Sequence, residues 1–288
     1  MSISWEDADR RLAAAAKIVN REEPVEVRGP LSVGVDLGTA DVVFMVLDAS
    51  GEPAAVFLEW AEVVRDGVVV DYMGAVDIVR GMAEKARRRT GMDITHAATS
   101  FPPGTDRRLS TNIIETARLE VAAVRDEPSC VAELLDLHNV AVVDFGGGTT
   151  GTAVVQEGRV VFSADEPTGG RHMSLVIAGH YGVSFEEAEA RKRQPEKYDV
   201  LGLVRPTVLR VADIVARHIR GYAVTRLILT GGSFMLPGAS DIIAAELGLP
   251  VTMPSEPLLL TPLAIASLPR DPALSRPVSF NMQPKTTE

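Results

Sequence analysis

Hydrophobic residues along the chain form runs of strand length, and two of these runs end in nearly the same polar sequence. Residues 33–39 read VGVDLGT and residues 142–149 read VVDFGGGT, so an aspartate, a glycine and a threonine follow each apolar run. A second apolar run comes directly after each copy, which predicts a hairpin that returns beside the first strand. The pattern therefore predicts two related strand–loop–strand units, one in each half of the chain.

The rest of the pattern alternates between strand-like and helix-like segments, which is typical of an α/β fold. Strands are expected within 31–50, 54–64, 68–71, 94–101, 121–124, 140–162 and 227–230. Helices are expected near 5–20, 74–90, 109–120, 129–137, 171–194, 204–221 and 237–247, the last of them started by Pro237. We divide the chain into an amphipathic helix and linker over 1–30, a first lobe over 31–139, a second lobe over 140–268 and a disordered tail over 269–288.

Glycines at the end of the second apolar run raise two further interpretations. Gly146, Gly148 and Gly151 match the G-x-G-x-x-G fingerprint of dinucleotide-binding proteins, but that fingerprint needs a helix directly after it. Residues 152–162 instead read as two strands around a Glu-Gly turn, and the G-x-x-x-x-G-K-[ST] pattern of a P-loop occurs nowhere. Because glycines also let backbone amides approach an anion, the two units predict a phosphate-binding cleft of another class.

Composition supports an ordinary globular protein with a core in each lobe, since 46% of the 288 residues are hydrophobic and 24% are charged. The net charge of −10 disfavours binding to nucleic acid or to an anionic membrane surface. The basic clusters are residues 87–89, expected on a solvated helix face, and residues 191–193. A lone cysteine, Cys130, and the absence of a long apolar run lead us to expect a cytoplasmic protein.

The N-terminal helix has two interpretations that the sequence leaves open. Trp5, Leu12, Ala16 and Val19 recur at helical spacing, so the helix has an apolar face. The helix is either an appendage packed on the domain, which we favour, or a detachable docking helix for a partner.

Five segments resemble, in the same order, the motifs of the actin, Hsp70 and sugar-kinase superfamily of ATPases. They are phosphate 1 at 36–39, the first connecting segment at 127–132, phosphate 2 at 144–149, the adenosine motif at 230–233 and the second connecting segment at 257–266. Within this superfamily, residues 31–267 resemble the ethanolamine-utilisation protein J family. The segments that carry this resemblance are 96–106, 163–170 and 261–267. The resemblance implies two duplicated ribonuclease H-like lobes around a nucleotide cleft, and the short intervals between motifs predict reduced peripheral subdomains.

The resemblance also assigns roles to residues of the cleft, with ATP and Mg²⁺ as the implied cofactors. Asp36 and Asp144 end equivalent strands and are placed to hold the metal, and Glu127 matches the residue that orients the attacking water, so these three are the expected catalytic residues. The expected cofactor-binding residues are Gly38, Thr39, Gly146, Gly147, Gly148, Thr149, Thr150, Gly169, Gly170, Glu189, Lys192, Arg193, Gly231, Gly232 and Ser233. Glu189, Lys192 and Arg193 share one helical face by their spacing.

Some positions depart from the Hsp70-like pattern. No motif places the catalytic lysine of that branch, Met235 stands where it has an arginine against adenine, and Leu258 stands where it has an acid. We therefore expect nucleotide binding with slow or absent hydrolysis, that is, at most a weak Mg²⁺-dependent ATPase.

The leading functional hypothesis is an ATP-binding, chaperone-like accessory protein of ethanolamine utilisation. In this hypothesis, closure of the lobes on the nucleotide acts on an enzyme of the pathway or on a shell protein of a bacterial microcompartment. Two alternatives share the same cleft: a small-molecule kinase of the sugar or acetate type, and a subunit of an actin-like filament. The sequence shows no clear second acid for a kinase and no specific filament surface, and it leaves the client and the oligomeric state open.

Overall fold

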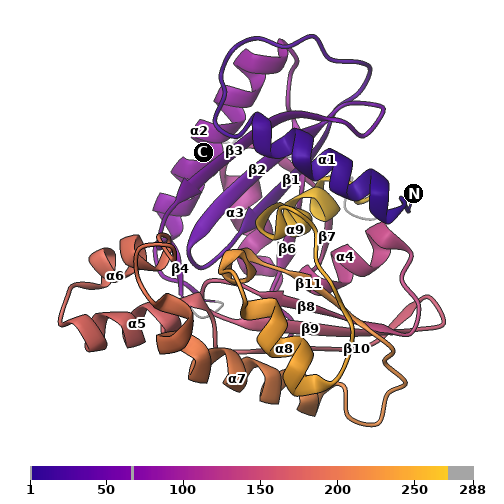
Figure 1. Cartoon of the computed structure of the whole chain (residues 1–288). Helices are drawn as coiled ribbons and strands as arrows, with labels where there is room; N and C mark the ends of the chain where they lie inside the picture. The colour runs from indigo at the N-terminus through magenta and orange to yellow at the C-terminus, as the bar shows by residue number, and fades with distance from the viewer. Residues whose placement is uncertain (1, 66–67, 272–288) are drawn as a thin grey trace, which may run out of the picture.

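Two five-stranded sheets form two lobes that lie one above the other in the computed structural model (Figure 1). The structure describes residues 2–65 and 68–271, so most of the tail expected over 269–288 lies outside the described residues. The N-terminal half builds the upper lobe, coloured indigo to purple, and the lower lobe runs from magenta to orange. The chain is thus organised as the duplicated pattern predicts.

The two sheets have the same topology. In lobe I the order is β3-β2-β1-β6-β7, with β1 at Ser32–Leu37, β2 at Asp41–Leu47, β3 at Pro53–Trp60, β6 at His96–Phe101 and β7 at Glu120–Asp126. In lobe II it is β10-β9-β8-β11-β12, with β8 at Val140–Phe145, β9 at Thr150–Gln156, β10 at Arg159–Glu166, β11 at Leu227–Thr230 and β12 at Val251–Thr252. Each sheet joins an antiparallel meander to strands that run parallel to its first strand. The duplication inferred from the two glycine motifs is therefore confirmed at the level of the fold.

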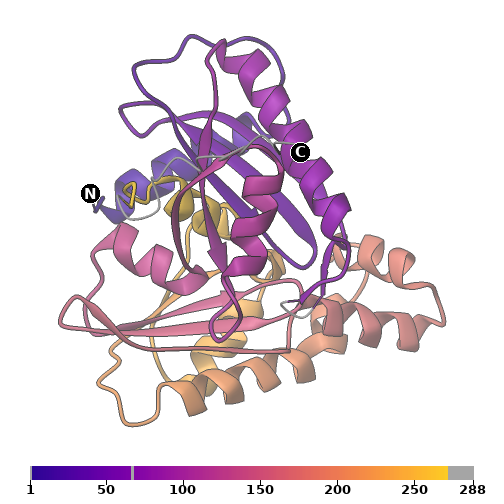
Figure 2. The same ribbon diagram turned by 180° about the vertical axis from the view of Figure 1, so that it is seen from behind.

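Helices cover both faces of each sheet. The bounds are α1 Trp5–Lys17, α2 Tyr72–Thr90, α3 Arg108–Thr116, α4 Glu127–Leu135, α5 Gly170–Tyr181, α6 Phe185–Lys192, α7 Val200–His218, α8 Ala239–Leu247, α9 Pro257–Ala266 and the 3₁₀ helix η1 Gly232–Met235. On β2, Val42, Phe44 and Val46 pack with α2 and α3 on the outer face, whereas the alternate residues share a core with α1, α4 and α9. Helices α7 and α8 cover the outer face of the second sheet (Figure 2).

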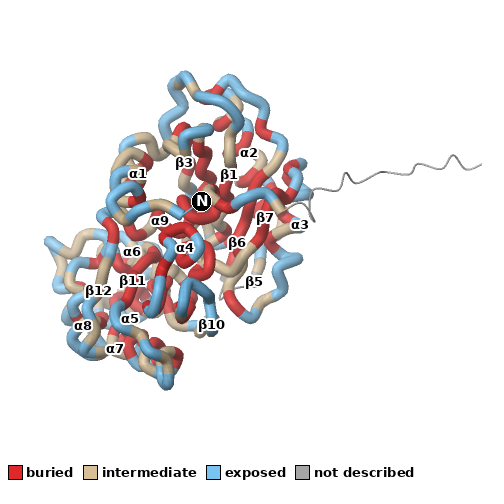
Figure 3. Tube along the Cα trace, turned by 90° about the vertical axis from the view of Figure 1, so that its right-hand side faces the viewer, coloured by how far each residue is buried: buried red, intermediate tan, exposed pale blue. Residues whose placement is uncertain are grey.

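Helices α4 and α9 lie between the lobes, and their buried residues join strands from both sheets in one core. Figure 3 shows this buried band running through the middle of the molecule, with exposed loops at both ends. The insertions into each lobe are small. They are the two-stranded sheet of β4 (Val64–Arg65) and β5 (Val68–Val69) in lobe I and the α5–α6 pair in lobe II, so the peripheral subdomains are reduced as expected.

The N-terminal helix α1 is packed on the molecule and contacts both lobes. Its apolar face, with Leu12 fully buried, is part of the core between the lobes. On its polar side, Arg10 donates two hydrogen bonds of 2.7 Å to Glu52 in lobe I. Asp9 accepts a hydrogen bond of 2.8 Å from the backbone of Ser255, in the loop before α9. These contacts favour the packed interpretation, since α1 would have to leave this core to offer its apolar face to a partner.

Several local boundaries differ from the sequence-based expectation for identifiable reasons. Helix α8 begins at Ala239 because Gly238, with φ of 85°, precedes it in the left-handed region, so Pro237 lies before the helix. Helix α3 ends early because Arg118 takes φ of 66° and turns the chain into β7. Arg89 is buried, not solvated, and donates to the carbonyls of Ala54 and Glu23. No helix of the described ranges is long and apolar enough to cross a membrane.

Candidate functional site

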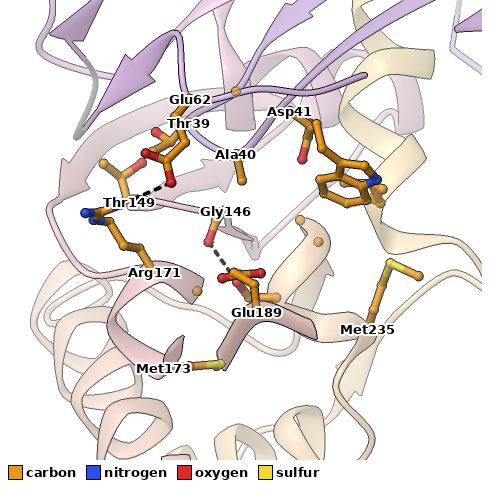
Figure 4. A pocket seen from close by; sticks show the side chains of 18 of the residues that line it. Thr39, Ala40, Asp41, Glu62, Gly146, Thr149, Arg171, Met173, Glu189 and Met235 are labelled. Atoms are coloured by element: carbon orange, nitrogen blue, oxygen red, sulfur yellow. Dashed lines mark hydrogen bonds and ion pairs between the residues drawn. The ribbon is translucent and has the colours of Figure 1, made fainter. Parts of the chain in front are cut away.

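A cavity of about 680 Å³ lies between the lobes and is lined by residues of both (Figure 4). Its size is in the range of small-molecule and cofactor sites. The predicted site residues that line it are Asp36, Gly38, Thr39, Glu127, Asp144, Gly146, Gly147, Thr149, Gly170, Glu189, Lys192, Arg193, Gly231, Gly232 and Ser233. Residues predicted from separate motifs are thus brought together at one place.

The two aspartates of the repeated motif occupy equivalent positions near the ends of β1 and β8 and face the same cavity. Asp36 accepts a hydrogen bond of 3.3 Å from the hydroxyl of Ser100. Asp144 accepts one of 2.8 Å from the hydroxyl of Thr261, on α9. Gly231 makes this approach possible, because a Cβ there would lie 2.5 Å from Asp144 Oδ1. The chain therefore passes directly beside the second aspartate.

Glu127 is the first residue of α4, at the point where the chain crosses from lobe I to lobe II. The helix starts there because Asp126 caps it, accepting a hydrogen bond of 3.3 Å from the backbone of Ser129, and because Pro128 suits the first turn. This start directs the Glu127 carboxyl group into the cavity beside both aspartates.

The acids of the cavity strongly influence one another. Burial, together with the charges of Asp144 and Asp41, raises the pKa of Asp36 to about 8. Burial raises the pKa of Asp144 to about 6, against the lowering effect of the Thr261 hydrogen bond. Burial and the neighbouring carboxylates hold the pKa of Glu127 well above its usual range. A cavity of this kind favours a cation, because the ionised acids repel one another when no cation is present.

The donor set fits Mg²⁺ held partly through water. Among the residues that the structure describes, no three His, Cys, Asp or Glu side chains are placed to ligate one metal ion. Mg²⁺ in nucleotide sites keeps several waters and is bound by one or two carboxylates together with the phosphates. Asp36 and Asp144 can supply those carboxylates from opposite lobes.

The two glycine loops touch each other across the cleft. A Cβ on Gly148 would lie 2.7 Å from Thr39 Oγ1, and one on Gly147 would lie 2.7 Å from the Cβ of Ala40. The second loop is fixed from behind, since the Gly146 carbonyl accepts hydrogen bonds from Gly170 N at 3.0 Å and from the Ser233 hydroxyl at 2.7 Å. Close packing therefore requires glycine at these positions.

Three predicted binding residues lie outside the cavity lining, which corrects their expected placement. Thr150 is fully buried and its hydroxyl donates to the Thr168 carbonyl at 2.6 Å, so it supports the loop from behind. Gly148 and Gly169 pack on each other, and a Cβ on Gly169 would lie 2.5 Å from the backbone of Gly148. Gly148 and Gly169 therefore hold the loop in place by close packing.

The three predicted residues of α6 and its end are engaged with protein groups. Lys192 Nζ donates to Gly170 O at 3.0 Å, to Ser174 Oγ at 2.8 Å and to Glu189 Oε1 at 2.6 Å. Burial lowers the pKa of this lysine. Lys192 therefore ties α6 to the start of α5.

Two contacts between residues that line the cavity join lobe II to lobe I. The Arg193 guanidinium lies 3.8 Å from the centre of the Trp60 ring, and Arg171 Nη1 lies 3.4 Å from Glu62 Oε1. Figure 4 shows Arg171 and Glu62 facing each other. No sequence motif marks Trp60, Glu62 or Arg171, although Arg171 directly follows the predicted Gly-Gly pair. Asp41, which lines the cavity at the start of β2, also lies outside the motifs.

Comparison with known families agrees with this architecture. The family described as Type IV pilus assembly protein PilM matches residues 128–261, which run from α4 into α9. A crystal structure of MreB5 of Spiroplasma citri bound to AMPPNP has a TM-score of 0.65 at 16% identity, over 82% of this chain and 95% of that one. At this identity the likeness concerns the fold, which is that of the actin-like ATPases.

Two more similar proteins cover almost the whole chain. Ethanolamine utilization protein EutJ of Escherichia coli is 51% identical over 264 residues, which are 91% of this chain and 94% of the relative. The crystal structure of EutJ from Carboxydothermus hydrogenoformans is 42% identical with a TM-score of 0.86, and the match covers 91% of this chain and 98% of that one. The chain therefore belongs to the ethanolamine utilization protein EutJ family and has the actin-like ATPase fold.

Proposed function

We propose that this protein is an ATP-binding, chaperone-like accessory protein of ethanolamine utilisation. The two lobes would close on bound Mg²⁺-ATP, and the altered outer surface would bind or release an enzyme of the pathway or a microcompartment shell protein. Membership of the EutJ family supports the pathway, and the actin-like fold supports the nucleotide. Its place in the cell follows from the same proposal: the cytoplasm, in association with the microcompartment.

The observation that carries the proposal is the pairing of Asp36 and Asp144 across one cavity. They end equivalent strands of a duplicated fold, and a glycine loop follows each of them. Each lobe contributes one carboxylate and one glycine loop to the cavity. A ligand that binds to both lobes therefore sets the distance between them.

The residues of the site divide into three roles in this proposal. Asp36 and Asp144 hold Mg²⁺, which when bound neutralises phosphate charge. Thr39, Thr149 and the glycine amides bind the phosphate oxygens from opposite lobes, and Glu127 orients water for slow hydrolysis. The residues proposed to face the nucleoside are Gly231, Gly232, Ser233, Glu189 and Arg193, with Lys192 and Gly170 supporting them.

Asp144→Ala is expected to weaken Mg²⁺-ATP binding by about 100-fold, or roughly 2.7 kcal/mol, because one of the two metal-holding carboxylates is lost. Isothermal titration calorimetry on the full chain measures this change. The matched control is Asp213→Ala, which removes an exposed acid on α7 outside the cavity and leaves binding unchanged. Unchanged binding in Asp144→Ala, with its fold confirmed by circular dichroism, would contradict the assignment of the site.

The proposed interaction with a partner predicts that the amount of partner captured by this protein depends on the bound nucleotide. Tagged protein loaded with ATP, loaded with ADP or left free is used to capture proteins from cells growing on ethanolamine. A pathway enzyme or shell protein is expected to differ at least about fivefold between two of these states, the lower end of ordinary allosteric coupling. Asp144→Ala should abolish the difference. Equal recovery in all three states would show that the partner does not respond to the nucleotide.

A further inference from the structure

An acid on β10, Asp165, lies on the same face of its sheet as Asp144, although the motifs assign it no role. In the strand register, Asp144 of β8 pairs with Gly151 of β9, and Gly151 pairs with Asp165 of β10. Residues directly opposite each other in a sheet project from the same face. Asp165 therefore points to the same side of the sheet as Asp144, with a residue that lacks a side chain between them.

The gap at Gly151 lets Asp165 lean toward the start of α4. A Cβ built on Gly151 would lie 3.6 Å from Asp165 Oδ1 and 3.6 Å from Cδ of Pro128, the residue after Glu127. Two positions earlier on the same face of β10, the Ser163 hydroxyl donates to Asp126 at 2.9 Å. This face of β10 therefore packs against the helix start that carries Glu127.

Asp165 also has one carboxylate oxygen that no described residue satisfies. Its Oδ1 is buried and has no hydrogen-bond partner among the described residues. Burial and the acids Asp144 and Glu166 raise the pKa of this carboxylate, whereas the Thr149 hydroxyl favours its charged form. Asp165 in turn helps to raise the pKa of Glu127. Leaving a buried oxygen unsatisfied destabilises the folded protein, so an ordered water or a cation is its natural partner.

We infer that Asp165 is a positioning residue for the divalent cation of the nucleotide. This inference rests on the proposed function and adds to it a residue that acts through others. Asp165 lies outside the cavity lining and acts on the cation through an ordered water and through the Thr149 hydroxyl. Groups of this kind orient the residues and waters that touch a metal, and losing one typically lowers metal affinity 10–100-fold.

Asp165→Asn tests the inference because it keeps the shape of the side chain and removes its charge. With the full chain saturated by ADP, the affinity for Mn²⁺, measured by electron paramagnetic resonance, is expected to fall about 10–100-fold. Binding of ADP in the presence of EDTA is expected to change less than about twofold. The unfolding temperature of the metal-free protein should stay the same or rise, because the repulsion from Asp144 and Glu127 is relieved.

A matched control and a second variant separate this role from general damage to the strand. Glu166→Gln alters the next residue, whose side chain faces α7 and pairs with Arg217 at 3.0 Å. Glu166 acts on Asp165 only through its charge, so Mn²⁺ affinity should change less than about twofold. Gly151→Ala keeps Asp165 and places a methyl group in the gap at ordinary contact distance. The methyl group would occupy the space of the proposed ordered water, so Mn²⁺ binding should weaken by about tenfold. This variant serves as the test if Asp165→Asn does not fold.

The outcomes distinguish this inference from the proposed function. If the wild-type protein and Asp165→Asn bind Mn²⁺-ADP equally well, the inference is overturned, whereas the proposed nucleotide site is still supported. An equal loss of ADP binding with and without metal, together with a lower unfolding temperature, shows a purely structural residue and also overturns it. A wild-type protein that binds no nucleotide under either condition overturns both.

Discussion

Gly34→Ala is expected to lower the free energy of unfolding by about 3 kcal/mol, the upper part of the range for overpacking a core. Gly34 lies in the middle of β1, where an added Cβ would be 2.4 Å from the backbone nitrogen of Ala266 and 2.7 Å from its Cα. These are backbone atoms of α9, which cannot change rotamer to relieve the clash. Strand and helix must therefore separate.

The same change should reach the nucleotide site, because α9 also carries Thr261, whose hydroxyl donates to Asp144. Urea unfolding followed by circular dichroism measures the stability, and calorimetry measures Mg²⁺-ATP binding, which we expect to weaken as well. Gly81→Ala is the matched control. Nothing lies within 4 Å of a Cβ at that position in α2, so alanine should stabilise the protein by about 0.5–1 kcal/mol. Equal stability of the two variants would contradict the close packing of β1 on α9.

The second large effect is a loss of stability of the metal-free protein as the pH rises. Burial and neighbouring acids raise the pKa of Asp36 to about 8, that of Asp41 to about 7 and that of Asp144 to about 6. The unfolded chain releases these protons near pH 4, so the folded state binds more protons between about pH 4 and pH 8. The contribution of these groups to the free energy of unfolding is therefore fully present below about pH 4. It is lost as the pH rises through their pKa values in the folded state.

Between about pH 6 and pH 9 the free energy of unfolding should fall by roughly 2–4 kcal/mol, because a tenfold change in an acid constant corresponds to about 1.4 kcal/mol. Urea unfolding in EDTA at several pH values measures it. Asp36→Asn should flatten the dependence and raise stability at the alkaline end, whereas the exposed Asp213→Asn should not. Stability that rises with pH in this window would show that these acids are ionised in the folded, metal-free protein.

The sequence by itself determined the duplicated architecture and the identity of the paired acids. Strand alternation, the acid at a strand end and the glycines after it are local patterns, and they recur at Asp36 and Asp144 in the same order. The turn at Glu157 and Gly158, both with positive φ, gave the β9–β10 hairpin and excluded a dinucleotide-binding helix. Such features depend on residues a few positions apart, so the sequence carries them directly.

Only the tertiary structure decided which neighbours of those motifs face the cavity. Thr149 lines it and Thr150 turns away, because successive residues at the start of a strand point to opposite sides. Arg193 meets Trp60 and Asp165 joins Asp144 through packing of the lobes and register across three strands, which bring together residues far apart in the chain. Contacts of this kind depend on how whole elements pack, and no local pattern of polar and apolar residues encodes them.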